Sequence, residues 1–583
     1  MRKIKRYLLT LLIVFIFAIS GCSGKTRGGF DAFTEQLFLA WVASPLDANF
    51  LVKDAEAFGF DELEVEPLSF SKEEHEAHNR YLEEVLEELR GFNYKKLDAE
   101  RKLTYRVLED YLESELAYAD FYHYATPLGS YLGYQARLPL LLSEYHFYTK
   151  RDIENYFAYL ETAETSFRNI LAFEKEKAAN GFGMNDRQIE GIIKQCRDFL
   201  SPKDNFLLSV FESKLRDLDY LSLDEKNLLT KEHRDLIENK FLPAYEFLAN
   251  ELETLKGRAK NNRGLAHFER GREYYQLLFR EATGTKMEVP EAYAYLERKF
   301  SESFSRMQGI LLKRPDLLRA FSALKIFPDK SYEEIYSFFA ENCAADFPGI
   351  GAVEVRIENI HASLEENSSP AMYFLSPIDA EVTEVIYVNG TLFRERSAYA
   401  FFTLAHESIP GHLLQHTVLK NGPLPKIRKL LGYSGYAEGW ATYAETYVGK
   451  YLEMDQDLLA LYHLNDELTY VALCLADIGI NYHGWSLAEF EDFIGGYFSM
   501  SASEVEDLYY RLIEVASNYL EYYFGYYQLL DLKEKFFKKA AKHGLDSDYH
   551  FHEFYLQTGP APFYILEEEI DRYLKSRSNS AFF

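Results

Sequence analysis

The stretch SAYAFFTLAHESIPGHLLQHTVLK, residues 397–420, begins as an apolar helix and is interrupted before it ends. In an unbroken α-helix, residues six apart point about 240° away from each other around the axis, so His406 and His412 would not meet. Pro410 has no backbone N–H and Gly411 tolerates many conformations, so we expect a distortion between the two histidines. A distortion that absorbs two residues would return His412 to the face of His406. The stretch therefore favours a metal site on an interrupted helix.

Two other interpretations of these histidines are open on the sequence. His412 and His416 are four residues apart, share a helix face, and could bind a metal as a pair without His406. The histidines could also make ordinary polar contacts and bind no metal.

A second stretch, YSGYAEGWATYAETYVG at residues 433–449, supplies the missing ligand type. A catalytic zinc takes three protein ligands and keeps one position open for water. His406, His412 and Glu438 would provide that set for one Zn²⁺. Glu445 lies two turns beyond Glu438, where a carboxylate can hold the second ring nitrogen of a ligating histidine. Glu407, next to a ligand, is the expected general base, because it would reach the water that the zinc activates.

The rest of the chain predicts a mainly α fold with a small β-sheet next to the active-site helix. Capping-box pairs such as Ser71 with Glu74 and Ser501 with Glu504 precede long amphipathic runs. We also expect a long helix from residue 151 to a stop at Asn180, and another that begins at Ser201-Pro202. Short β-branched and aromatic segments predict the strands. They are AVEVRIENI, AMYFLSP and TEVIYVN, which lie between residues 352 and 390. The last of them is expected to be an edge strand that pairs with an extended peptide.

The N-terminus predicts export and a lipid anchor. A basic start is followed by an apolar run and then by ISGC, which resembles a bacterial lipobox ending at Cys22. We expect four parts along the chain. They are a lipoprotein signal peptide (1–22), a spacer (23–45), an N-terminal helical region (46–340), and a C-terminal region with the sheet, the metal site and capping helices (341–583). The protein is then expected in the cell envelope, on the extracytoplasmic face of a bacterial membrane.

The charge and cysteine content of the chain argue against nucleic acid as a partner and against a disulfide framework. The formal net charge of the 583 residues is −28, so a phosphate backbone would be repelled and nucleic acid is not an expected partner. Three cysteines outside the N-terminus, Cys196, Cys343 and Cys474, are far apart and are expected to be buried thiols.

Taken together, several motifs resemble one family. HESIPGH with Gln415 resembles the H-E-x-x-P-G-H-H-x-Q signature of the bacterial domain-of-unknown-function 885 family, which looks like a helical relative of gluzincin metallopeptidases. The resemblance continues through the segments YVN, YAEGWATYAE, DIGINYHGWS, YYFG and LQTGPAPFYILEEEI. It implies His406, His412 and Glu438 as metal ligands and Glu407 as the catalytic acid/base. Tyr522, in the Y-x-x-G pattern, is the candidate donor for a tetrahedral oxyanion.

The sequence departs from the family pattern at three places. Leu413 stands where the pattern has a second histidine, and Asn481 replaces another histidine. The tripeptide Ala-Ser-Asn at residues 516–518 replaces Pro-Gly-Gln. The leading hypothesis is a zinc metallopeptidase that cleaves short peptides outside the cytoplasm. The alternatives are a non-catalytic lipoprotein that binds peptides or cell-wall material on a degenerate scaffold, and a zinc enzyme that cleaves another ester or amide.

Overall fold

The structure is a computed structural model that describes residues 27–201, 205–259, 261–360 and 370–580. The predicted signal peptide and Cys22 lie outside the described residues. The chain forms two compact units, and each is made of two segments. The first unit contains residues up to 274 together with 483–516, and the second contains 275–482 together with 517–583. The expected boundary at residues 340/341 therefore falls inside the second unit.

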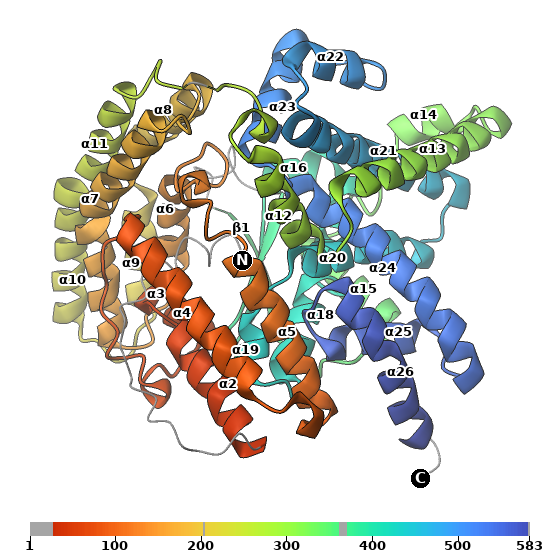
Figure 1. Ribbon diagram of the computed structural model, residues 1–583, viewed down its shortest axis with the longest axis horizontal. Helices are drawn as coiled ribbons and strands as arrows, with labels where there is room; N and C mark the ends of the chain where they lie inside the picture. The colour runs from red at the N-terminus through yellow and green to blue at the C-terminus, as the bar shows by residue number, and fades with distance from the viewer. Residues whose placement is uncertain (1–26, 202–204, 260, 361–369, 581–583) are drawn as a thin grey trace. The chain divides into compact units, whose positions relative to one another are not determined.

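The first unit is helical. Its helices are α2 (Arg27–Trp41), α3 (Pro45–Leu51), α4 (Lys72–Gly91), α5 (Ala99–Leu116), α6 (Tyr134–Glu144), α7 (Lys150–Ala179), α8 (Asp186–Leu200), α9 (Phe206–Arg216), α10 (Leu223–Leu236), α11 (Leu242–Glu253), α22 (Leu487–Gly495) and α23 (Ala502–Glu514). Helix α12 (Gly271–Thr283) contains the change to the second unit. Helix α11 packs against both α7 and α8, and Figure 1 shows the three helices side by side.

Local sequence signals set most of these helix ends. The Ser71 hydroxyl accepts a hydrogen bond from the Glu74 N–H, and the Glu74 carboxylate accepts one from the Ser71 N–H, which completes the predicted capping box of α4. The long helix α7 ends at Ala179 as expected. The helix that we expected to begin at Ser201-Pro202 begins later, and residues 202–204 lie outside the described residues. Helix α9 begins at Phe206 with Asn205 as its N-cap, because that side chain accepts a hydrogen bond from the helix backbone.

Residues 27–41, expected to be part of a spacer, form helix α2. Phe30, Phe38 and Trp41 are each at most 6% exposed. Burial of aromatic side chains on one helix face stabilises this segment, and the spacer prediction rested on the glycine-rich, polar composition of residues 23–29.

The second unit contains the small sheet and the remaining helices. The helices are α13 (Val289–Lys313), α14 (Leu317–Ser322), α15 (Tyr332–Cys343), α16 (Gly390–Glu395), α17 (Ser397–Glu407), α18 (His412–Asn421), α19 (Lys426–Leu430), α20 (Ser434–Val448), α21 (Gln456–Ile478), α24 (Asn518–Ala540), α25 (Asp548–Thr558) and α26 (Phe563–Ser580). The strands are β1 (Val355–Asn359), β2 (Ala371–Phe374) and β3 (Glu384–Val388). The prediction of a mainly helical protein with a small sheet is confirmed.

Strand order corrects one expectation. The order is β1-β3-β2, with β1 parallel and β2 antiparallel to β3. The segment TEVIYVN thus forms the central strand and has no free edge, so the prediction that it is an edge strand was wrong. Its alternate residues Glu384, Ile386 and Val388 are buried, as expected for a strand covered on one face. The edge that faces α17 belongs to β2.

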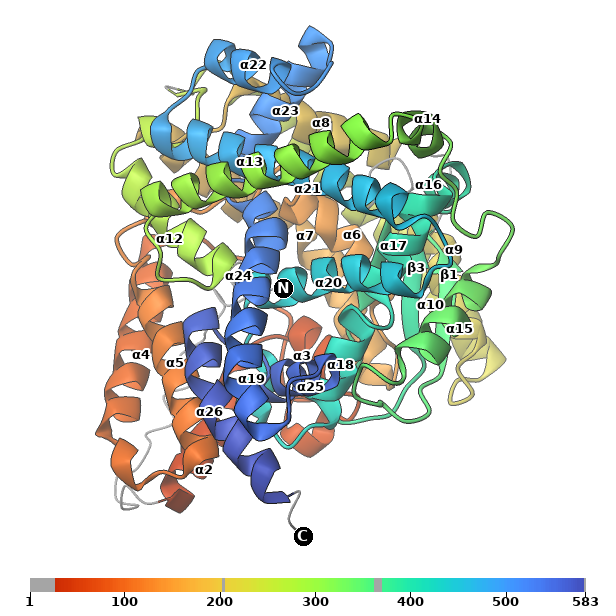
Figure 2. The ribbon, with the colours of Figure 1, turned by 90° about the vertical axis from the view of Figure 1, so that its right-hand side faces the viewer.

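Three glycines allow α20 and α24 to cross at close range, as Figure 2 shows. A Cβ built on Gly439 would lie 2.5 Å from the carbonyl carbon of Gly525. A Cβ on Gly525 would lie 2.5 Å from the carbonyl oxygen of Gly435. Larger residues would push the helices apart, so these glycines fix the position of α24 over α20.

One predicted helical run is broken. The expected capping box of Ser501 with Glu504 starts α23, but the helix stops at Glu514 and α24 starts at Asn518. Ser517 adopts a left-handed conformation with φ of 67°, and its N–H donates to the buried carboxylate of Asp477 at 2.9 Å. That long-range hydrogen bond stabilises a conformation that serine rarely adopts.

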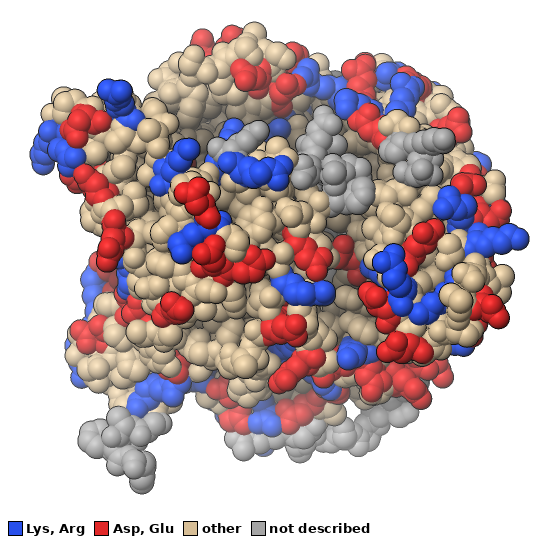
Figure 3. All heavy atoms as spheres, turned by 180° about the vertical axis from the view of Figure 1, so that it is seen from behind, with Lys and Arg blue, Asp and Glu red and all other residues tan. Residues whose placement is uncertain are grey.

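Charged side chains of both signs are mixed on the surface. On the face in Figure 3, Lys and Arg side chains lie among Asp and Glu side chains. The three cysteines, Cys196, Cys343 and Cys474, are buried free thiols, as predicted. Within the described residues, no helix is both long enough and apolar enough to cross a membrane.

Candidate metal centre

The centre is built where α17 ends and α18 begins. The intervening residues 408–411 leave the helical conformation, and α18 restarts directly at His412. A Cβ on Gly411 would overlap the carbonyl oxygen of His406, so only glycine fits this close return of the chain. The helix is therefore broken and resumed, which is a larger change than the distortion that Pro410 and Gly411 predict.

The loop is anchored by α20. The indole N–H of Trp440 donates to the carbonyl oxygen of Pro410 at 2.9 Å. Trp440 is fully buried, and its ring stacks on Tyr555 of α25 at 5.2 Å between centroids. A buried and stacked tryptophan thus holds the loop between the two histidines in place.

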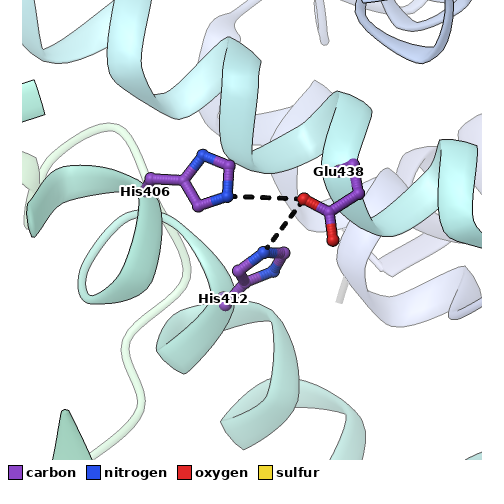
Figure 4. A group of neighbouring side chains, drawn as sticks. All are labelled: His406, His412 and Glu438. Carbon is purple, nitrogen blue, oxygen red and sulfur yellow. Dashed lines mark ion pairs between the residues drawn. The ribbon is translucent and has the colours of Figure 1, made fainter. Parts of the chain in front are cut away.

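The interruption brings His406 and His412 to one point. Figure 4 shows both imidazoles directed at the carboxylate of Glu438 from α20. The His406 Nε2 lies 3.4 Å and the His412 Nε2 lies 3.5 Å from the same oxygen, Glu438 Oε2. In the part of the chain that the structure describes, these three form the one group of His, Cys, Asp or Glu that could hold a metal, with ligand atoms within 4.8 Å of one another.

The spacing fits a small divalent cation. Ligands about 2.0–2.1 Å from a tetrahedral zinc are separated by about 3.3 Å along each edge of the tetrahedron. The two nitrogen-to-oxygen distances match that edge closely. Two imidazole nitrogens and one carboxylate oxygen also form a donor set typical of catalytic zinc. His406, His412 and Glu438 would hold the ion and leave one position open.

Electrostatics favour a positive charge at this point. Burial by itself would raise the pKa of Glu438, but the charge of His412 and the hydrogen bonds with both histidines lower it below its usual range. Burial would lower the pKa of His406, but the hydrogen bonds to Glu438 and Glu445 outweigh it and raise that pKa well above its usual value. Several acidic groups thus stabilise a proton here, and they would stabilise a metal cation for the same reason.

Glu445 occupies the supporting position that the sequence suggests. Its Oε1 lies 2.6 Å from the Nδ1 of His406, the nitrogen that does not face Glu438. This contact fixes the ring orientation and leaves Nε2 available as a ligand.

Glu407 is held by the sheet. The backbone N–H of Tyr373 on β2 donates to Glu407 Oε2 at 2.9 Å. The carboxylate next to His406 therefore has a defined position. Sequence analysis missed Tyr373, because a backbone donor leaves no signal in residue type.

Tyr522 reaches the centre from α24. Its ring lies 6.4 Å from that of His406, nearly parallel to it. The negative charge of Glu438 and burial raise the pKa of Tyr522 well above its usual value, so the phenol keeps its proton and can donate it in a hydrogen bond. The glycine crossing of α20 and α24 explains the Y-x-x-G pattern, because Gly525 permits the approach that places Tyr522 here.

His416, the alternative partner of His412, points elsewhere. Its Nε2 lies 3.0 Å from the backbone carbonyl oxygen of Ser376, which can only accept a hydrogen bond. Burial lowers the pKa of His416 to about 4, so the ring is neutral and donates from Nε2. The structure groups His412 with His406 and not with His416.

Comparison with known proteins places the chain in a family. The model of the bacterial protein family of unknown function DUF885 matches residues 54–570. The chain belongs to the DUF885 family. No curated protein matches it.

Two solved structures share the fold of this DUF885 chain, and each is described as a "putative lipoprotein". The protein from Colwellia psychrerythraea has 16% identity and a TM-score of 0.82, covering 94% of this chain and 99% of its own. The protein from Shewanella oneidensis, of unknown function, has 17% identity and a TM-score of 0.62 with the same coverage. At such identities the likeness shows the fold alone.

The departures from the DUF885 pattern have structural roles here. Leu413 is fully buried and packs as an apolar residue. Asn481 is also fully buried, and its amide donates to Asp477 at 3.3 Å. The Asp477 carboxylate also accepts hydrogen bonds from the hydroxyl of Tyr275, at 2.6 Å, and from the N–H of Ser517. Asn481 thus belongs to a buried polar cluster around Asp477.

Proposed function

We propose that this protein is a gluzincin-like zinc metallopeptidase that cleaves short peptides outside the cytoplasm. The observation that carries the proposal is the convergence of the Nε2 atoms of His406 and His412 on one oxygen of Glu438. Two histidines and one acid with an open fourth position are the ligand set of catalytic zinc in several peptidases. A peptide bond is the preferred target because Glu407 can return a proton to a leaving amine.

Each side chain has a role in that chemistry. When bound, zinc polarises a carbonyl group and makes water a nucleophile near neutral pH. Glu407 would accept the proton of the attacking water and pass it to the departing nitrogen. Tyr522 would donate a hydrogen bond to the oxygen that becomes negative. Glu445 would keep the His406 ring oriented through its Nδ1.

We further propose a lipid anchor at Cys22 and a location in the cell envelope. The lipobox-like ISGC and the description of the two structural neighbours as lipoproteins support this. The substrate would then be a peptide on the extracytoplasmic side of the membrane.

The test uses the chain from residue 23 onward, which contains every described residue. It should carry about one zinc per chain by elemental analysis and cleave members of a peptide library. Glu407→Gln should keep the zinc and lose roughly 10²- to 10⁴-fold in kcat, because its neutral amide cannot take a proton. Glu467→Gln is the control, since that carboxylate accepts hydrogen bonds from Ser303 and Tyr527 in the same unit.

Three results would count against the proposal. One is a wild type that binds no zinc, and another is a Glu407→Gln variant with full activity. Peptide-induced thermal stabilisation that chelators do not affect, with no product formed, would instead support the non-catalytic alternative.

A further inference from the structure

A buried polar cluster in the second unit connects the candidate general base to the helix that carries a metal ligand. We propose that Tyr373, Glu384 and Lys420 are positioning residues: they fix strand β2 so that its backbone holds Glu407 beside the metal centre. The catalytic part of this inference rests on the proposed function, in which Glu407 is the base.

The position of Glu407 depends on β2 because the contact is made by the backbone. The Tyr373 N–H donates to Glu407 Oε2 at 2.9 Å. Strand β2 has only four residues, Ala371–Phe374, and it pairs on one side, with β3. A short edge strand is weakly fixed by its ladder alone, so side-chain contacts must contribute to its position.

Glu384 supplies those contacts from the central strand. Glu384 is 2% exposed, and its Oε2 accepts a hydrogen bond from the phenol of Tyr373 at 2.6 Å. Its Oε1 accepts the hydroxyl of Ser376 at 2.8 Å. Burial raises the pKa of Tyr373 well above its usual value, so the phenol stays protonated and keeps donating. One buried carboxylate thus binds the β2 segment at two places, three residues apart.

Lys420 neutralises that carboxylate and joins it to the metal centre. Its Nζ lies 3.4 Å from Glu384 Oε1 and 2.9 Å from Ser376 Oγ, and the residue is 8% exposed. Lys420 lies on α18, the helix that begins with the ligand His412. His416, on the same helix, donates to the Ser376 carbonyl. One charge pair therefore connects the ligand-bearing helix to the strand that holds the base.

The geometry gives a specific consequence. If the cluster is weakened, Glu407 loses its fixed position, while His406, His412 and Glu438 keep theirs. A misplacement of about 1 Å in a catalytic group reduces the rate by about 10²-fold. The expected defect is therefore in turnover and not in metal content.

Tyr373→Phe tests this, because it removes only the phenol oxygen that Glu384 binds. We expect kcat on a cleaved peptide to fall roughly tenfold to a hundredfold, with KM within about twofold and zinc content unchanged. Tyr451→Phe is the matched control: it removes a phenol that donates to the Asp346 carboxylate at 2.5 Å in the same unit. The control should leave kcat unchanged.

A second measurement does not depend on activity. Amide hydrogen exchange, followed by mass spectrometry on fragments that cover residues 371–376, should be at least about tenfold faster in Tyr373→Phe than in the wild type. It should be unchanged in Tyr451→Phe. A combined Lys420→Met and Glu384→Gln variant removes both buried charges and so avoids an unpaired one. It should also show faster exchange and a lower kcat, because a neutral amide oxygen holds the Tyr373 phenol more weakly than a carboxylate does.

The outcomes separate this inference from the proposed function. Unchanged exchange in Tyr373→Phe overturns the inference, and so does faster exchange with an unchanged kcat, because the cluster would then be merely structural. If the zinc-loaded wild type cleaves no peptide, the proposed function fails. The exchange rates then decide whether the cluster fixes β2, with faster exchange supporting it.

Discussion

Replacing Glu445 with Gln should weaken metal binding without abolishing it. The Glu445 Oε1 lies 2.6 Å from His406 Nδ1, a short distance typical of a hydrogen bond to an ionised group. Glutamine has the same shape, and its amide oxygen can still accept from Nδ1–H. The substitution therefore removes the negative charge and leaves the ring orientation almost unchanged.

The size of the effect follows from that difference. A hydrogen bond to a charged group contributes about 1.5–3 kcal/mol, and a neutral one contributes about 0.5–1.5 kcal/mol. The loss is thus about 1–2 kcal/mol, or roughly a fivefold to thirtyfold increase in the Kd for zinc. That range overlaps the roughly tenfold to hundredfold loss found when partners of metal-binding histidines are changed.

A competition titration against a chromophoric chelator at constant pH would measure the Kd. Glu467→Gln serves again as the control, because the Glu467 carboxylate accepts hydrogen bonds from the hydroxyl groups of Ser303 and Tyr527 and not from a histidine. Equal zinc affinity in Glu445→Gln and the wild type would refute the supporting role of Glu445. An equal loss in the control would show that the effect is not specific to His406.

Two further predictions concern stability. Gly525→Ala should lower the free energy of unfolding by about 1–3 kcal/mol in a denaturant titration, because the new Cβ would lie 2.5 Å from the Gly435 carbonyl oxygen. Gly309→Ala in α13 is the control and should be neutral or stabilising, because a Cβ there meets nothing within 4 Å. Equal effects of the two substitutions would contradict the claim that Gly525 permits the close crossing of α20 and α24. Burial lowers the pKa of His233 and of His552 to about 3. Below pH 6.5, the usual pKa of histidine, these two side chains take up protons in the unfolded chain but stay neutral in the folded chain. Each should therefore reduce the stability of zinc-free protein by about 1.4 kcal/mol per pH unit as the pH falls from about 6 towards 3, and a denaturant midpoint as high at pH 5 as at pH 7.5 would contradict this.

Local signals predicted much of the fold. The capping box at Ser71 and the amphipathic run after it predicted α4, and the β-branched and aromatic segments predicted all three strands. Strand order was not predictable in the same way, because β1, β2 and β3 pair through contacts distant in sequence. The break at Ser517 was missed for a similar reason, since a carboxylate forty residues away, Asp477, stabilises its left-handed backbone.

The sequence likewise predicted some residues of the candidate metal centre and not others. The proline and glycine between His406 and His412 predicted an interruption, and ligand chemistry pointed to Glu438 on the next long helix. The role of β2 could not be predicted, because the Tyr373 contact to Glu407 uses a backbone N–H that every residue except proline has. The Glu384–Lys420 pair was also hidden, since buried and exposed charges look alike in a sequence.

The central claim is that His406, His412 and Glu438 bind one cation together. Anomalous diffraction at the zinc absorption edge, from crystals of the zinc-loaded protein, locates that ion directly. We predict one peak about 2.0–2.1 Å from the Nε2 atoms of both histidines and from a carboxylate oxygen of Glu438. A zinc peak bound by His412 and His416, or no ordered zinc at these residues, would contradict it.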